Sequence, residues 1–310
     1  MPQDLSDFPP IVTAVLSEIS RRHDADSATP VQTGGICNAI YFLGDDLVLR
    51  VPRNDPDFVA ALEREVIAVP AARTAGVRTP ALVTFDDSRS LIAVPYAVYE
   101  RVPGQPLERL GLLPDAAPLA LEELGRDLAR LHDGVDRNDG TEIDAVFVAL
   151  DPRDAADELA ERGSFTRMEA NWLDQMLGRL APAVEAPFEK RLCHGDTQGT
   201  NIMVAPASAT YLALIDWGNA TWDDPAKDFA GLPLGAIPFV LAGYRSVSRL
   251  ENAEARILWW QLQNALYLLH RPPLPELPKR AWAERPMAQL LEITRFLITP
   301  QGRKWRDLVT

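Results

Sequence analysis

The chain has 310 residues, of which 47% are hydrophobic and 24% charged, and its formal net charge is −13. This length and composition are typical of one large domain or two lobes, and they exclude a disordered, collagen-like or coiled-coil chain. The excess of Asp and Glu argues against nucleic acid and anionic lipid as partners, because both are bound through clustered Lys and Arg. The charge is compatible with a cationic small molecule, and equally with a solvated acidic surface.

The candidate metal ligands are scattered along the sequence. Cys37 and Cys193 lie far apart, and neither they nor the four histidines follow a zinc or redox spacing. The first residues lack the basic and apolar regions of a signal peptide, and the best membrane candidate, Gly231 to Tyr244, is too short to span a bilayer. We therefore expect a soluble, cytoplasmic protein, monomeric or homodimeric, with no membrane partner.

The first hundred residues combine helical patterns with short apolar runs. Helical spacing and apolar runs predict helices over 11–22 and 58–75, and strands over 37–43, 47–51, 81–85 and 91–99. The turn Gly44-Asp45-Asp46 between the first two strands predicts a hairpin. The segment from Arg101 to Pro106 then breaks the pattern, and we place the boundary between two lobes before it.

Beyond residue 100 the pattern is mainly helical. Apolar spacing predicts helices over 118–132, 152–162, 165–180, 252–269 and 284–297. Two short segments of different character, 192–204 and 211–222, lie between these helices. The expected fold class is α+β, with a small β-rich N-lobe (1–100) and a larger, mainly helical C-lobe (101–310).

The residues that point to chemistry lie in these two segments. Asp196 precedes Asn201 by five positions in a polar, glycine-containing stretch, and Asp216 ends the next apolar run. Phosphoryl transfer needs a carboxylate that orients the attacking hydroxyl, together with an amide and a second carboxylate that hold Mg²⁺. Asp196, Asn201 and Asp216 supply these groups in the order found in kinases.

These motifs resemble the aminoglycoside phosphotransferase family. The resemblance rests on His194-Gly195-Asp196 with Asn201, on Ile215-Asp216-Trp217, and on the segment from Asp224 to Ala230, and it extends over roughly residues 30–269. It implies a protein-kinase-like two-lobed fold and Mg²⁺-dependent transfer of the γ-phosphate of ATP or GTP to a small-molecule hydroxyl. The motifs are specific for the family, which also includes macrolide and choline-type kinases, and not for one substrate.

The resemblance also implies a nucleotide site in the N-lobe. Arg50 would contact the phosphates where protein kinases use lysine, and Glu65, with Glu63 as a weaker candidate, would pair with it. The base would bind to the backbone of the segment around Glu100, a contact that does not choose between ATP and GTP. The implied nucleotide-binding residues are Gly34, Gly35, Asn38, Arg50, Glu65, Glu100 and Val102.

The acceptor is expected in the C-lobe, where the resemblance places it beside the catalytic loop. The candidates are carboxylates and polar or aromatic residues of a late helix, namely Asp157, Glu161, Asp223, Trp259 and Gln263. A solvated surface is the alternative for the carboxylates, and core packing is the alternative for the late helix. We expect His194 and Asp228 to be structural, organising the catalytic loop, and Gln198 replaces the loop lysine of protein kinases.

The sequence thus predicts a phosphotransferase that modifies a hydroxyl of an antibiotic, favouring a cationic one such as an aminoglycoside. A metabolic kinase for a sugar, amino alcohol or amino acid is the first alternative. A nucleotide-binding module without catalysis is the second, although it requires the loss of a polar catalytic group and all three are present. A protein kinase is the most distant alternative, since no activation segment stands out between Asp216 and Asp224.

Overall fold

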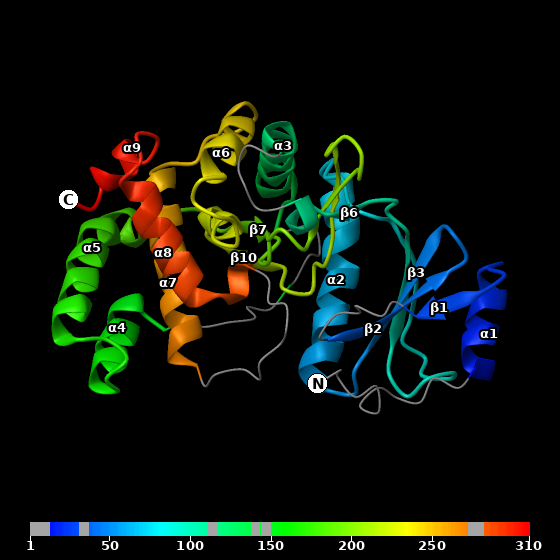
Figure 1. Ribbon diagram of the computed structural model, residues 1–310. Helices are drawn as coiled ribbons and strands as arrows, with labels where there is room; N and C mark the ends of the chain where they lie inside the picture. The colour runs from blue at the N-terminus through cyan, green and yellow to red at the C-terminus, as the bar shows by residue number, and fades with distance from the viewer. Residues whose placement is uncertain (1–12, 31–36, 111–116, 138–142, 144–149, 272–281) are drawn as a thin grey trace.

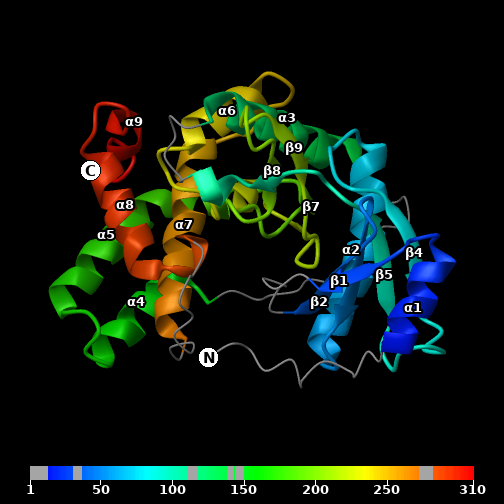
Figure 2. The same ribbon diagram turned by 45° about the vertical axis from the view of Figure 1, so that its right-hand side comes forward.

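The computed structural model describes residues 13–30, 37–110, 117–137, 143, 150–271 and 282–310. An antiparallel sheet and α1 lie at one end of the molecule, and most of the helices lie at the other (Figure 1). The long helix α2 (Pro56–Thr74) stands between these two parts in both views (Figure 2). This arrangement confirms the α+β fold class, whereas the division after residue 100 stays a prediction.

The N-terminal sheet has five strands in the order β1-β2-β3-β5-β4, and all neighbours are antiparallel. Its strands are β1 (Ala28–Pro30), β2 (Asn38–Leu43), β3 (Leu47–Pro52), β4 (Leu82–Asp86) and β5 (Tyr96–Glu100). The predicted hairpin is therefore present, as β2 and β3. Side chains alternate along a strand, so Arg50 lies on the opposite face from the fully buried Leu49 and Val51. The strand thereby turns a cation toward α2.

Helices α1 (Thr13–Arg22) and α2 bury different faces of this region. Ile19 of α1 packs with the sheet in a small apolar cluster of its own. Asp55 caps the first turn of α2 by accepting a hydrogen bond from the Asp57 N–H at 2.8 Å. Leu62 and Val69 of α2 belong instead to the large core that extends through the helical part. Helix α2 is therefore fixed to the C-terminal part by apolar burial.

The C-terminal part carries two small sheets, with strand orders β10-β7 and β6-β8-β9. Their strands are β6 (Gln105–Pro106), β7 (Arg191–Cys193), β8 (Ile202–Val204), β9 (Tyr211–Leu214) and β10 (Thr221–Asp223). The helices are α3 (Pro118–Gly134), α4 (Pro152–Glu161), α5 (Arg167–Glu185), α6 (Ile237–Arg245), α7 (Ala253–His270), α8 (Pro286–Leu297) and α9 (Arg303–Arg306), with the 3₁₀ turns η2 (Leu107–Leu110), η4 (Pro225–Phe229) and η5 (Trp282–Glu284). The motif residues lie in the loops that join these short strands.

Helix α6 was not among the predicted helices, and it packs very closely on α3. A Cβ atom on Gly125 of α3 would lie 2.0 Å from the Val240 carbonyl oxygen, and one on Gly243 would lie 1.9 Å from that of Glu122. Glycine at both positions allows the two helix backbones to touch. The apolar stretch around α6 is thus accounted for by this packing. No helix within the described ranges is long and apolar enough to cross a membrane.

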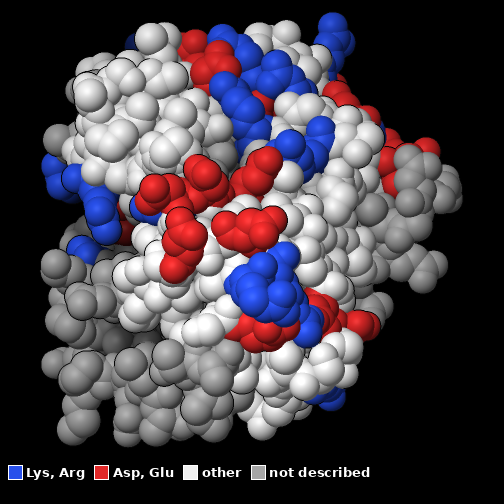
Figure 3. Space-filling view, turned by 90° about the vertical axis from the view of Figure 1, so that its right-hand side faces the viewer, with Lys and Arg blue, Asp and Glu red and all other residues white. Residues whose placement is uncertain are grey.

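One face of the sheet end of the molecule carries charges of both signs. Figure 3 shows acidic side chains gathered across the middle of this face, with basic side chains beside them. On α1, at this end of the molecule, Arg22 pairs with Glu18 at 3.0 Å and lies 3.7 Å from Asp86 of β4. The excess negative charge of the chain is therefore partly offset here by neighbouring arginines.

Candidate active site

The catalytic-loop motif connects β7 to β8, and its central carboxylate is held from both sides. Gln198 Nε2 donates to Asp196 Oδ1 at 2.9 Å, and Asn201 Nδ2 donates to Asp196 Oδ2 at the same distance. Asn201 Nδ2 also donates to the Asp196 carbonyl, so its amide nitrogen is fully committed to Asp196. The Asn201 oxygen Oδ1 is consequently left for other partners, and Thr200 donates to it at 3.3 Å.

Asp216 follows β9 and lies directly beside this loop. The Ile215 N–H donates to the Asn201 carbonyl at 2.9 Å, which joins the two motifs through the backbone. Asp216 has φ +71°, in the left-handed region that non-glycine residues rarely adopt. Its contacts must therefore compensate a local strain. Burial disfavours its ionised form, but the attraction and hydrogen bond of Arg50 outweigh this and hold the pKa of Asp216 below its usual range.

Arg50 joins the N-terminal sheet to both α2 and the Asp216 loop. Its Nη1 donates to Glu65 Oε1 at 2.6 Å and its Nη2 to Asp216 Oδ1 at 2.7 Å. Glu65 is 3% exposed. Burial raises its pKa to about 7 even though Arg50 acts in the opposite direction. Of the two candidate glutamates, 63 and 65, the one that pairs with Arg50 is therefore Glu65, and Asp216 shares the same guanidinium.

A second carboxylate, Asp228 of η4, holds the backbone of the catalytic loop. Its two oxygens accept from the N–H groups of His194 and Gly195, both at 2.8 Å. Gly195 has φ +79°, and a Cβ there would lie 2.0 Å from the Asn219 carbonyl oxygen. Burial opposes ionisation of Asp228, but hydrogen bonding from His132 lowers the pKa below its ordinary value. The ionised carboxylate is thus fixed against the backbone of residues 194 and 195.

His194 contacts the backbone on either side of the site. Its Nδ1 accepts from the Asp196 N–H at 3.2 Å, so its Nε2 carries the proton and donates to the Ile215 carbonyl at 3.1 Å. Its ring meets that of Trp217 edge-on, with centroids 4.6 Å apart. Burial lowers the pKa of His194, which keeps this neutral tautomer in place. The imidazole therefore links the Asp196 loop to the Asp216 loop.

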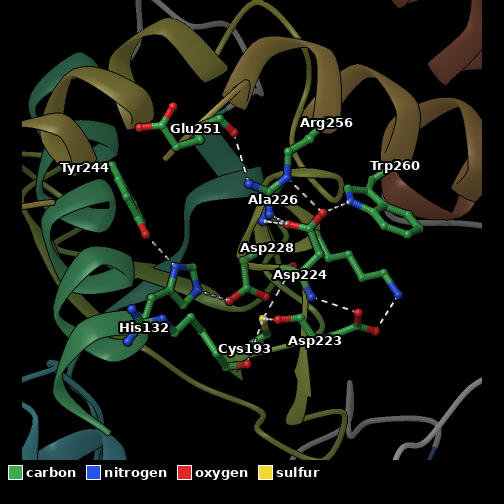
Figure 4. Close-up of polar contacts among 12 residues, drawn as sticks. His132, Cys193, Asp223, Asp224, Ala226, Asp228, Tyr244, Glu251, Arg256 and Trp260 are labelled. Carbon is green, nitrogen blue, oxygen red and sulfur yellow. Dashed lines mark hydrogen bonds and ion pairs between the residues drawn. The ribbon is translucent and has the colours of Figure 1, made fainter. Parts of the chain in front are cut away.

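Asp228 and two neighbouring side chains carry atoms that are able to ligate a metal ion. The ligand atoms of His132, Cys193 and Asp228 lie within 4.8 Å of one another, and all three residues are buried (Figure 4). However, His132 is already bonded to Asp228 at 3.0 Å and to the Tyr244 hydroxyl at 3.1 Å. Burial raises the pKa of Cys193 well above its usual range. The hydrogen bonds of His132 and Asp228 let the cluster brace the loop.

A buried ion pair between Arg256 and Asp224 supports η4, the turn that follows β10. Asp224 is fully buried, and its carboxylate accepts from the Arg256 guanidinium, from Trp260 Nε1 at 2.8 Å and from the Ala226 N–H at 2.7 Å (Figure 4). It also caps η4, the turn that carries Asp228. Helix α7 thereby positions η4 and, through it, the catalytic loop.

The structure places the remaining nucleotide-site candidates as follows. Gly34 and Gly35 lie outside the described residues. Asn38 opens β2, and its buried Oδ1 has no hydrogen-bond partner in the part of the chain described. Glu100 ends β5 and bonds with the backbone of Ala81 through both its N–H and its side chain. In the described ranges the Val102 N–H has no partner, so Val102 is the better donor for a base.

The acceptor candidates lie on α4, β10 and α7. Asp157 is exposed on α4 and paired with Arg167 at 2.7 Å, and Glu161 is exposed at the end of the same helix. Asp223 pairs with Lys227 at 2.5 Å. Trp259 and Gln263 are buried on α7, where Gln263 donates to the Leu150 carbonyl at 2.9 Å. Asp223 adjoins the Asp224 network, since its Oδ1 accepts from the Asp224 N–H at 2.8 Å.

Sequence reasoning missed several residues that hold the site together. Arg256 and Trp260 bind Asp224, Arg64 Nε donates to the Gly218 carbonyl at 2.9 Å, and Thr79 accepts from the Trp217 indole. A charged residue amid the apolar pattern of α7 was a usable signal for Arg256, because a buried cation needs a partner. Nothing in the local sequence marked Thr79.

Burial raises the pKa of Cys37 to about 11, and the carboxylate of Asp216 adds to this shift.

The chain is similar to several known proteins. Its residues 28–240 match the family model described as the phosphotransferase enzyme family. It is 29% identical over 182 residues to acyl-CoA dehydrogenase family member 10 of Mus musculus, a match that takes in 55% of this chain and spans only 16% of the length of that relative.

Three solved structures illustrate the similarity in fold. Wild-type aminoglycoside 2′-phosphotransferase-IIIa in its GDP complex gives a TM-score of 0.61 at 19% identity, with 96% of this chain and 95% of that chain covered. A choline/ethanolamine kinase family protein from Mesorhizobium loti gives 0.60 at 17% identity, covering 95% and 99%. Macrolide 2′-phosphotransferase from Brachybacterium faecium gives 0.56 at 22% identity, covering 86% and 100%. The fold and the match over residues 28–240 together confirm the resemblance in the sequence, and the chain belongs to the phosphotransferase enzyme family.

Proposed function

We propose that the chain is a small-molecule kinase that transfers the γ-phosphate of ATP or GTP to a hydroxyl of its acceptor. The observation that carries this proposal is the convergence of Asp196, Asn201, Asp216 and the Arg50–Glu65 pair. These residues come from separate segments of the chain, and hydrogen bonds join each segment to the next. Such a set of oriented charges suits phosphoryl transfer, in which catalysis consists mainly of positioning and charge stabilisation.

Each residue has a role that follows from its contacts. Asp196, held by two amides, accepts a hydrogen bond from the acceptor hydroxyl and receives its proton. Arg50 binds the nucleotide phosphates and is kept in place by Glu65. The backbone N–H of Val102 is the donor offered to the base. His194 and Asp228 keep the loop backbone in the conformation that presents Asp196.

The donor set at Asn201 and Asp216 fits Mg²⁺. The amide nitrogen of Asn201 is tied to Asp196, which turns its oxygen away from that residue, and Asp216 is held as a carboxylate. Oxygen ligands of this kind are those that Mg²⁺ prefers. When bound, the ion supplies charge neutralisation to the phosphates of the nucleotide.

The acceptor that we propose first is a hydroxylated antibiotic, and the aminoglycoside and macrolide phosphotransferases among the structural neighbours support it. A polycationic acceptor has less support than the sequence suggested, because Asp157 and Asp223 are already paired with Arg167 and Lys227. A metabolic kinase is the second candidate. The choline/ethanolamine kinase family protein, which is covered over 99% of its length, favours it.

The test is release of ADP or GDP in the presence of Mg²⁺, with aminoglycosides, macrolides and hydroxylated metabolites as acceptors. Asp196→Ala is the control, and we expect it to reduce turnover by roughly 10²–10⁴-fold while nucleotide affinity is retained. Turnover restricted to one antibiotic class identifies a resistance enzyme, and turnover on a metabolite identifies the second candidate. Full turnover in Asp196→Ala, or nucleotide binding without transfer to any acceptor, would contradict the proposal.

A further inference from the structure

Residues 216–218, which come shortly after β9, are linked to α2 either directly or through Arg50 of β3. Asp216 bonds to Arg50, which is paired with Glu65 of α2. The backbone N–H of Trp217 acts on the Glu65 carboxylate and works to lower the pKa of that group. The Gly218 carbonyl accepts from Arg64 of α2 at 2.9 Å. The loop that carries the proposed metal ligand is therefore fixed by elements more than a hundred residues earlier in the chain.

Trp217 is the central residue of this loop. Its side chain is fully buried and packs edge-on against His194. A buried indole N–H needs an acceptor, because leaving it unpaired costs free energy. Trp217 Nε1 donates to Thr79 Oγ1 at 3.0 Å, and the Leu214 carbonyl is a more distant acceptor at 3.3 Å. The Thr79 hydroxyl is thus the better partner of the indole.

Thr79 is itself held in place by its neighbours. Its carbonyl accepts from Arg73 Nη1 at 2.5 Å, and it is 4% exposed. The preceding carbonyl, of Arg78, accepts from the Leu214 N–H at 2.9 Å. The Arg78 side chain is paired with the fully buried Asp127 of α3 at 3.0 Å. The hydroxyl of Thr79 is therefore a fixed point to which the indole is tied.

We propose that Thr79 is a positioning residue for Asp216, acting through the Trp217 indole. Asp216 has a left-handed backbone, which is uncommon for any residue with a Cβ, so the contacts of the flanking residues help to maintain it. Without the Thr79 hydroxyl the indole keeps only the more distant Leu214 carbonyl, which allows the Trp217 ring and the adjacent backbone to relax. The Asp216 carboxylate then lies less often where it meets Mg²⁺ and nucleotide. This inference rests on the proposed phosphotransferase function.

The experiment compares Thr79→Val, which removes the hydroxyl at nearly constant shape, with Thr79→Ser, which keeps it. ADP binding is measured by calorimetry at several Mg²⁺ concentrations and without Mg²⁺. We expect Thr79→Val to weaken Mg²⁺-dependent ADP binding about tenfold relative to wild type. Thr79→Ser, which keeps the hydroxyl, should retain most of the wild-type affinity. Metal-free ADP binding should be the same in both. Thr74→Val, which removes an exposed hydroxyl from α2, is the matched control and should bind as wild type.

Trp217→Phe removes the other partner of the bond and keeps an aromatic ring. It should weaken Mg²⁺-dependent binding as Thr79→Val does, and the double variant should show no further loss. Trp217→Phe also carries the test if Thr79→Val does not fold. A lower melting temperature of Thr79→Val with unchanged Mg²⁺-dependent affinity overturns the inference, as do additive effects in the double variant. Absence of Mg²⁺-dependent binding in the wild type overturns the phosphotransferase proposal itself, and the inference with it.

Discussion

Arg50 and Asp216 lie 166 positions apart in the sequence, and the guanidinium of one donates to the carboxylate of the other at 2.7 Å. The same guanidinium donates to Glu65 of α2 at 2.6 Å. One cation therefore serves two carboxylates, one on α2 and one in the loop after β9. The proposed phosphate-binding residue, its helix partner and the proposed metal ligand form one unit before any ligand is bound.

We expect Arg50→Lys to lower kcat/KM for the nucleotide by about ten- to a hundredfold. A lysine is a point charge that cannot offer two parallel donors to Glu65 and Asp216 in the geometry of the guanidinium. The fold should survive, because a positive charge remains beside Glu65. Steady-state kinetics with varied ATP and GTP measure the effect.

Arg50→Met serves as the contrasting variant. It leaves the buried Glu65 carboxylate without a cation, and we expect a loss of about 3–5 kcal/mol in the free energy of unfolding. Arg22→Lys, at an exposed ion pair, should change neither kinetics nor stability. Wild-type kinetics in Arg50→Lys would remove Arg50 from the nucleotide site.

Gly195→Ala should be strongly destabilising. The residue has φ +79°, and its new Cβ would lie 2.0 Å from the Asn219 carbonyl oxygen, so the loop must move. We expect a loss of more than about 3 kcal/mol in the free energy of unfolding, measured by urea denaturation. Gly178→Ala in α5 is the matched control, since its Cβ meets nothing within 4 Å. It should stabilise the protein by up to about 1 kcal/mol. Equal effects of the two substitutions would show that the loop is free to rearrange.

The catalytic motif could be predicted because its chemistry is local in the sequence. Asp196 and Asn201 are five residues apart in one loop, and the predicted apolar run ends at Asp216. The Arg50–Glu65 pair could be anticipated only through the family resemblance, since it joins a strand to a helix. Spacing alone does not show which residue of β3 faces α2.

The acceptor side could not be predicted in the same way. The acidic residues that suggested a cationic ligand have partners on neighbouring turns or helices, as Asp157 has in Arg167 and Asp223 in Lys227. Burial of α7 followed from its apolar pattern. Which tryptophan donates to Asp224, Trp260 and not Trp259, depends on how α7 is rotated about its axis. Such rotation is set by tertiary packing, which a periodic pattern does not specify.

The ion pair between Asp224 and Arg256 offers a test of how α7 supports the site. Arg256→Met leaves the fully buried Asp224 without its cation, and we expect a loss of about 3–5 kcal/mol in the free energy of unfolding. Adding Asp224→Asn to this variant should recover part of the loss, because the remaining side chain is neutral and can still bond to Trp260. Arg167→Met, at the exposed pair with Asp157, should leave stability nearly unchanged. A double variant less stable than Arg256→Met would contradict this account.

His194 should make the stability of the protein sensitive to acid. Burial holds its pKa in the folded state below the ordinary value of 6.5, which applies to the unfolded chain. Unfolding therefore takes up a proton below about pH 6.5, so this contribution to stability is present above that pH and is lost as the pH falls toward the lower folded pKa.

His194→Gln does not titrate, and its lost hydrogen bonds should cost about 1–2 kcal/mol at pH 7.5. The difference in the free energy of unfolding between wild type and His194→Gln, measured by urea denaturation, should be smaller at pH 5 than at pH 7.5. The reason is that acid destabilises only the protein that has a histidine at this position. For Gly178→Ala, which changes no titrating group, the difference from wild type should be the same at both pH values. If this difference for His194→Gln stays constant or grows in acid, His194 is not held neutral between the Asp196 loop and the Asp216 loop.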